Sequence, residues 1–170
     1  NSKAPFNDKR FRQAINYALD RESMEKAMFG SFSATSSPVP TSYAEYNPDI
    51  LTYEYDVEKA TSLLNESSYK GEEVELLYHP IDVGYDMVAQ FTEQSLNEIG
   101  INVKMKSVEI AQWTENVFNQ KAFDLALTSI VPKPSVFDLL NHPYGKINGE
   151  SIQWDNKEWY EKLNEAKEAD

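Results

Sequence analysis

The sequence of 170 residues contains no cysteine, which excludes disulfide bonds, thiolate nucleophiles and cysteine-built zinc sites. No apolar run approaches the roughly 18 residues that a membrane-spanning helix needs. The six glycines are scattered along the chain, so they form neither a P-loop nor a dinucleotide-binding fingerprint. These absences disfavour nucleotide chemistry and thiol chemistry.

Positive charge is also scarce, with 16 lysines and arginines against 28 acidic residues and a net charge of −12. Binding to a phosphate backbone depends on clustered basic side chains, so we exclude nucleic acid as a partner. The same imbalance disfavours adhesion to anionic lipid. The hydrophobic fraction of 41% is typical of a globular chain, and the length favours one domain.

Catalytic side chains are poorly represented. Only His79 and His142 could act as an imidazole base, and no nucleophile elbow surrounds a serine. The two histidines lack the spacing of metal ligands, and we interpret both as partly exposed loop residues. A hydrolase that uses two carboxylates stays open as an alternative, although no spacing selects a pair. We therefore predict no catalytic residue, no metal site and no cofactor.

Helical periodicity organises the first third of the chain. We expect Asn7 to cap a first helix, Asp20 to cap a second helix over 21–29, and Gly30 to end the second helix. The apolar residues expected to face the interior are Phe11, Ala14, Ile15, Ala18, Met24, Ala27 and Met28. Proline-rich residues 31–53 predict an irregular segment.

A third helix is expected to begin after Asp56, with Val57, Ala60, Leu63 and Leu64 on its apolar side. Beyond it, the strands "EEVELLYH", "INVKMKSV" and "FDLALTSIV" alternate with the helices "DVGYDMVAQFTEQSLNEIG" and "AQWTENVFNQ". This alternation predicts a parallel sheet, with the third strand buried. A final helix carries Trp159, Leu163 and Ala166, and Trp113 and Trp159 are expected in the core.

Several segments also resemble a known family. "NSKAPFNDKRFRQAINYALDRESMEKAMFG" is similar to the pattern N-x-x-x-P-F-x-D-x-x-V-R-Q-A-I-x-Y-A-I-D-R-x-x-I-x-x-x-x-x-x-G of bacterial extracellular solute-binding proteins of family 5. This is the dipeptide, oligopeptide and nickel binding group that feeds ABC importers. "YEYDVEKATSLLNESSYKGEEVEL" resembles a later motif of the same family, and the likeness covers almost the whole chain.

The resemblance implies an α/β fold, a lobe of the periplasmic-binding-protein-like type II class with a mainly parallel central sheet flanked by helices. Residues 1–170 would be one fragment of the carboxyl-terminal ligand-binding lobe of a larger two-lobed protein. That protein would be a monomer outside the cytoplasm, either a cell-surface lipoprotein of a Gram-positive cell or a periplasmic protein. It would capture oligopeptides for a membrane permease. Nickel, a metal chelate or another solute, and a role as a peptide-pheromone receptor or interaction module, remain alternatives.

In a parallel sheet, ligands gather beyond the carboxyl ends of the strands. The ligand-binding residues expected there are His79, Tyr85, Ser129, Ile130, Val131, Pro132 and Lys133. Peptide-binding members of the family commonly carry G-W-x-x-D-x-x-D-P in the second of these loops, with an acidic side chain for the peptide's amino group. Here Lys133 stands in place of an Asp, and residues 129–136 contain no acidic side chain. The usual anchor is missing, and Lys133 faces either a carboxylate or solvent.

Overall fold

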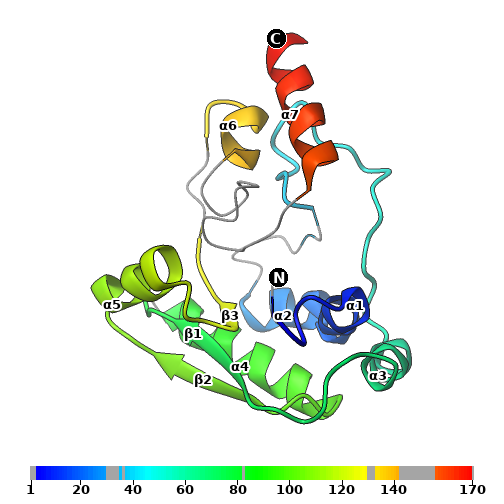
Figure 1. Cartoon of the computed structure of the whole chain (residues 1–170), viewed down its shortest axis with the longest axis vertical. Coiled ribbons are helices and arrows are strands. Elements are labelled where there is room, and N and C mark those ends of the chain that lie inside the picture. The colour runs from blue at the N-terminus through cyan, green and yellow to red at the C-terminus, as the bar shows by residue number, and fades with distance from the viewer. Residues whose placement is uncertain are drawn as a thin grey trace. The chain divides into compact units, whose positions relative to one another are not determined.

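The structure, a computed structural model, describes residues 3–29, 35, 37–81, 83–129, 133–141 and 156–169. The chain divides into two compact units, and each is described by itself. The larger unit comprises residues 3–36 and 52–128, and the smaller unit comprises residues 1–2, 37–51 and 129–170. Figure 1 labels the helices and strands of both.

Helix α1, Lys9–Ala18, begins one residue later than predicted. Its N-cap is Asp8, whose carboxylate accepts the backbone N–H of Arg10 at 2.9 Å. The prediction of Asn7 as the cap is wrong, because Asn7 lies in the preceding turn and donates its backbone N–H to Lys3. The apolar side of the helix is confirmed. Its buried residues are Phe11, Ala14 and Ala18, and Ile15 packs against the same core.

Helix α2, Arg21–Ala27, is capped by Asp20 as predicted, but it is shorter than expected and lies near the surface. None of its seven residues, all of which the structure describes, is buried. Ala27 is exposed, so its predicted inward orientation is wrong, while Met24 is half-buried. Two turns of helix are too short for an apolar stripe to cover much of a core. Phe29 already has left-handed backbone, with φ of 56°, and Gly30, the predicted stop, lies outside the described residues.

Helix α3, Val57–Asn65, is capped by Asp56, whose carboxylate accepts the N–H of Lys59 at 2.8 Å. Ala60 and Leu64 are buried, and the helix packs against α1 (Figure 1). Residues 37–56 contain turns and no helix or strand. The predicted third helix is therefore confirmed, as is the irregular segment before it where the structure describes it.

The sheet is parallel, as predicted, with strand order β2-β1-β3. Its strands are β1, Val74–Tyr78, β2, Val103–Ser107, and β3, Leu125–Ala126. Helix α4, Val83–Glu98, packs against β1 and β2. The third strand is not the buried strand predicted over "FDLALTSIV". It has two half-buried residues because it pairs with only Leu76 and Leu77 of β1, on one edge of the sheet.

The helix predicted after β2 forms as two parts, α5, Ile110–Thr114, and the π-helical segment η1, Glu115–Gln120. Lys121 ends this segment with a left-handed backbone, φ 53°. Trp113 and Val117 are buried, which confirms Trp113 as a core residue. Helix α5 lies at the arrowhead end of β2 (Figure 1).

The core of the larger unit joins its helices to the sheet. Its buried members are Phe6, Phe11, Ala14, Ala18, Ala60, Leu64, Val74, Leu76, Tyr78, Ala89, Leu96, Ile99, Ile101 and Val103. Four of the five residues of β1 are buried, so side chains on both faces of this strand are covered. In β2, by contrast, Lys104 and Lys106 are exposed. The sheet therefore has β1 as its buried central strand.

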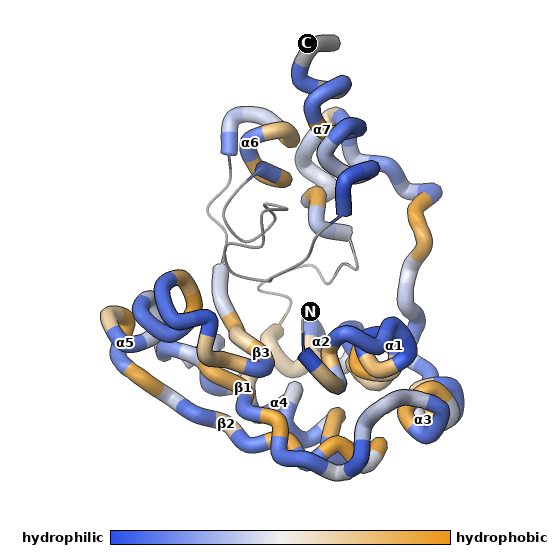
Figure 2. Tube along the Cα trace, in the orientation of Figure 1, coloured by the Kyte–Doolittle hydropathy of each residue, from blue (hydrophilic) through white to orange (hydrophobic). Residues whose placement is uncertain are grey.

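In the smaller unit, α6, Val136–Leu140, packs against α7, Lys157–Ala169. Leu139 and Leu163 are buried, and Trp159 is half-buried rather than in a core. The rest of α7 is mostly hydrophilic (Figure 2). The side chain of Ala166, also predicted on the apolar side, lies outside the described residues. Among the helices of the described ranges, none is long and apolar enough to cross a membrane.

Candidate functional site

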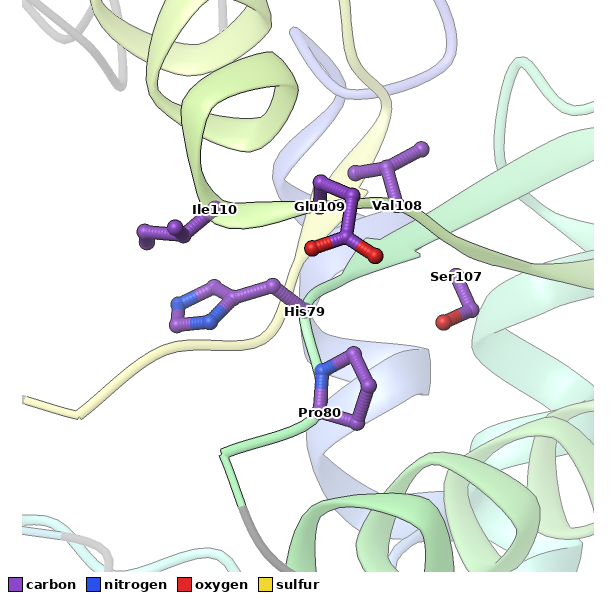
Figure 3. Close-up of a pocket in the computed structure, with 6 residues that line it drawn as sticks. All are labelled: His79, Pro80, Ser107, Val108, Glu109 and Ile110. Atoms are coloured by element: carbon purple, nitrogen blue, oxygen red, sulfur yellow. The ribbon is translucent and has the colours of Figure 1, made fainter.

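A pocket opens at the carboxyl ends of β1 and β2, inside the larger unit. Tyr78 and Ser107, the last residues of the two strands, are partners in the parallel register, so the loops that follow them start side by side. The pocket has a volume of about 360 Å³ (Figure 3). The residues that line it are His79, Pro80, Ser107, Val108, Glu109 and Ile110. Ligands of open parallel sheets bind at this edge.

Hydrogen bonds hold the two strand ends together. The backbone N–H of Val108 donates to the carbonyl of Tyr78 at 3.0 Å. The phenol of Tyr78 donates to the carboxylate of Asp86, on α4, at 3.0 Å. Burial raises the pKa of the Tyr78 phenol, and the hydrogen bond to Asp86 raises it further. The phenol therefore stays a neutral donor at physiological pH, and it ties β1 to the first turns of α4.

His79, one of the lining residues of this pocket, is packed against aromatic rings. Its imidazole meets the Trp113 indole edge to face at 5.1 Å and lies 6.0 Å from the Tyr85 ring. The residue is only 8% exposed, so the interpretation of His79 as a partly exposed loop residue is wrong. The residue follows β1 directly, and the helices that cover the strand end also cover its ring. His142 lies outside the described residues.

Glu109 and Ile110 form the opposite wall, and sequence reasoning assigned neither of them a ligand role. Figure 3 shows the carboxylate of Glu109 pointing into the space between His79 and Ser107. Glu109 occupies the N-cap position of α5, yet its side chain makes no capping hydrogen bond. The signal was present in the sequence: the strand-end rule applies to β2 as well as to β1, and Glu109 follows β2 by two residues.

The second predicted ligand segment, residues 129–133, belongs to the smaller unit. Ser129 is exposed and Lys133 is half-buried, while Ile130, Val131 and Pro132 lie outside the described residues. The backbone of Lys133 is clamped by Tyr43, whose hydroxyl donates to the Lys133 carbonyl at 2.7 Å and accepts its N–H at 2.9 Å. A ligand role for this segment stays a prediction, as it does for Tyr85 and His79.

Within the part of the chain that the structure describes, no three or more His, Asp or Glu side chains are grouped so that they could hold a metal ion. The pocket lining combines one imidazole, one hydroxyl and one carboxylate with apolar side chains. Such a mixed surface can contact a small organic solute through both polar and apolar groups.

The fold is that of the periplasmic-binding-protein-like type II class, as predicted. The structure of HbpA2 from Haemophilus parasuis aligns with 97% of this chain and 34% of its own, with a TM-score of 0.85 and 22% sequence identity. The helices and the parallel sheet of this chain therefore have the same arrangement as in that protein. This likeness defines the class of fold and nothing further about the ligand.

Residues 1–149 match the family described as "Bacterial extracellular solute-binding proteins, family 5 Middle", and the chain belongs to this family. Heme-binding protein A of Haemophilus influenzae is 38% identical over 81 residues, which cover 46% of this chain and 15% of that protein. The probable D,D-dipeptide-binding periplasmic protein DdpA of Escherichia coli is 28% identical over 133 residues, or 78% of this chain and 26% of that protein. The resemblance seen in the sequence is confirmed.

The chain spans about a quarter or less of the length of these two curated relatives. Both are named as binding proteins, and members of the family are solute-binding proteins rather than enzymes. The prediction of a protein without catalytic chemistry agrees with this family membership.

Proposed function

We propose that these residues belong to the carboxyl-terminal ligand-binding lobe of a longer, two-lobed protein that captures solutes for an ABC importer. The pocket at the carboxyl ends of β1 and β2, in a chain of this family, is the observation that carries the proposal. The short span of the chain relative to its relatives supports its being one part of such a protein.

In this proposal the pocket forms one wall of a cleft, and a second lobe closes over the bound solute by a hinge motion. His79 contributes a polar edge that the rings of Tyr85 and Trp113 hold in place. Ile110, 54% exposed, contributes apolar area that a solute can bury. Ser129 and Lys133, in the smaller unit, keep the ligand role predicted from the sequence as part of this proposal, and the Tyr43 hydroxyl holds the backbone of Lys133.

We propose a peptide or a related small solute as the ligand, since one relative is named for binding D,D-dipeptides. The protein would act outside the cytoplasm, as a cell-surface lipoprotein or in the periplasm, and deliver its solute as a monomer to a membrane permease. The name of the other relative adds heme to the solutes to be tested, and the family resemblance adds nickel chelates.

The test is a thermal-unfolding screen of the whole gene product that contains these residues. The panel would contain dipeptides, oligopeptides, nickel chelates and hemin. A solute at a hundred times its Kd adds about 2.7 kcal/mol to the free energy of unfolding, which is readily seen as a rise in Tm. We expect peptides to give this rise.

Two variants then connect the binding to the pocket. His79→Ala should remove most of the stabilisation by solute, whereas Lys70→Ala, an exposed change outside the pocket, should leave it unchanged. If no small solute stabilises the protein while a protein partner binds tightly, the chain serves a receptor or interaction system and the import proposal is wrong.

A further inference from the structure

The pocket contains an acidic side chain that the proposed function does not explain. Glu109 is the one acidic side chain among the described residues that line it, beside Ser107, Val108, Ile110, Pro80 and His79. Its carboxylate points into the pocket (Figure 3) and is not used to cap α5. A side chain at an N-cap position ordinarily accepts a backbone N–H of its own helix, so this carboxylate remains available to a ligand.

The basic residue nearest in sequence does not neutralise this carboxylate. The ammonium of Lys106 forms an ion pair with Glu75, on the neighbouring strand, at 2.8 Å. Lys106 also precedes Ser107 on β2, and successive side chains of a strand point to opposite faces of the sheet. The pocket therefore presents a carboxylate whose charge no lysine or arginine among its described lining residues offsets.

Two apolar side chains, Val108 and Ile110, line the pocket together with Glu109. Ile110 is 54% exposed. Val108 adds a half-buried apolar wall. Large aliphatic side chains at the mouth of a pocket are places where a ligand buries hydrocarbon. The combination matches a ligand whose positive charge lies at the end of an aliphatic chain.

We infer that this pocket selects the ammonium end of an aliphatic solute, with Glu109 as its counter-charge. A carboxylate in the same place would meet a like charge, which raises the free energy of the bound state. The net charge of −12 also favours a cationic ligand over an anionic one, because a negatively charged protein raises the local concentration of cations. The inference rests on the proposed function in taking the pocket as a solute site.

A bare metal ion fits this pocket less well than an ammonium group does. A divalent ion needs several oxygen or nitrogen ligands, and no group of three or more ligating side chains occurs in the described ranges. An ammonium group needs only one carboxylate and can donate its other hydrogen bonds to Ser107, to backbone carbonyls or to water. The ligand class is therefore an organic cation.

The experiment uses the whole gene product with methyl labels on isoleucine and valine, and it follows the Ile110 and Val108 signals by NMR. The probes are butylammonium, pentanoate and 1-butanol, which share a butyl chain and differ in charge. We expect saturable shifts with butylammonium and responses at least about tenfold weaker with the other two, the size of one charge-assisted hydrogen bond. Glu109→Gln should weaken butylammonium binding by a similar factor.

Two further variants separate local charge from long-range charge. Glu58→Gln removes the same charge from an exposed position on α3, outside the pocket, and should leave butylammonium binding unchanged. Glu109→Lys should reverse the preference, so that pentanoate binds more tightly than butylammonium. Equal responses to the two ions, no saturable shift with butylammonium, or unchanged binding in Glu109→Gln would each overturn the inference.

Failure of the inference about Glu109 can be distinguished from failure of the proposed function. If peptides stabilise the protein in the thermal screen but Glu109→Gln leaves every affinity unchanged, solute capture stands and the role of Glu109 is wrong. If no solute stabilises the protein and butylammonium gives no saturable shift, both are wrong.

Discussion

The two compact units of this chain are organised differently. In the larger unit, residues 3–36 and 52–128, apolar stripes of α1, α3 and α4 meet a central strand in one continuous core. In the described part of the smaller unit, Leu139 and Leu163 are the buried apolar residues, and turns connect much of the remainder. A periodic apolar pattern therefore predicts helices and strands well in the larger unit, where these elements pack on a shared core. It predicts the smaller unit less well, because single hydrogen bonds such as those of Tyr43 hold the chain there.

The largest expected difference is between two leucine truncations, one in each unit. Leu96→Ala in α4 removes a side chain that is fully buried and should lower the free energy of unfolding by about 2–5 kcal/mol. Leu163→Ala in α7 should cost about 2 kcal/mol or less, because Leu163 lies at the margin of burial, 8% exposed. Hydrogen exchange of β1 and α7 amides would report the two units separately.

Equal losses of protection in both variants, or a larger loss for Leu163→Ala, would show that the smaller unit has a core comparable to that of the larger one. Leu51→Ala supplies the control, since Leu51 is 70% exposed and its truncation should change little.

A smaller effect is expected for Tyr43→Phe, which removes both hydrogen bonds to the Lys133 backbone. Each half-buried backbone group that loses its partner costs about 1 kcal/mol, so the variant should lose about 1–2 kcal/mol locally. The amide of Lys133 should then exchange faster, while amides of β1 should be unaffected. Tyr46→Phe, in the same turn-rich segment, is the matched control. Equal effects of the two changes would show that the Tyr43 hydroxyl does not hold the backbone of Lys133.

The larger unit was mostly predictable from the sequence, and its errors have local causes. Helices α1 to α4 and the parallel sheet follow from apolar spacing and capping residues. The cap at Asp8 rather than Asn7 is a choice between adjacent capping residues, which periodicity does not resolve. The short β3 could not be predicted, because the apolar run gives no sign of how few residues pair with β1.

Removal of one helix N-cap from each unit should have a still smaller effect on stability. Asp56 caps α3 through the N–H of Lys59, and Ser135 caps α6 through the N–H of Asp138. Asp56→Ala and Ser135→Ala should each cost about 1 kcal/mol, the ordinary value of a cap. The first should lower the stability of the larger unit, whereas the second should only increase exchange within the five-residue α6, as measured by amide exchange. Global unfolding caused by Ser135→Ala would contradict the separation of the two units.

The smallest effect concerns pH and the surface charge of Asp8. Hydrogen bonds to the Asp8 carboxylate, first from the Arg10 side chain and then from the backbone N–H groups of Arg10 and Ser68, together lower its pKa from 3.8 to about 2. A carboxyl with a lowered pKa stabilises the folded state above its unfolded pKa, and this contribution is lost as pH falls from about 4 to about 2. Screening by solvent keeps the effect small.

Unfolding of the wild-type chain and of Asp8→Asn from pH 5 to pH 2 would measure this contribution. Asn retains the cap but cannot ionise, so the difference in stability between the two proteins should shrink as pH falls. Parallel curves over the whole range would show that the pKa of Asp8 is not lowered in the folded chain.

The candidate site was half predictable. His79 was expected because it follows a strand with a clear apolar pattern, and the structure places it in the pocket. Glu109 and Ile110 also follow a strand end, but they were missed because the strand order, which the sequence does not give, decides that the end of β2 lies beside that of β1. The Tyr43 clamp joins residues 90 positions apart, and no local pattern of the sequence indicates it.

The most direct test of solute capture at this pocket is a crystal structure of the whole gene product with the solute that stabilises it most. The pocket should hold part of that solute, in contact with His79 and with the carboxylate of Glu109. A solute bound with all of its atoms away from the residues that line the pocket would contradict the proposal.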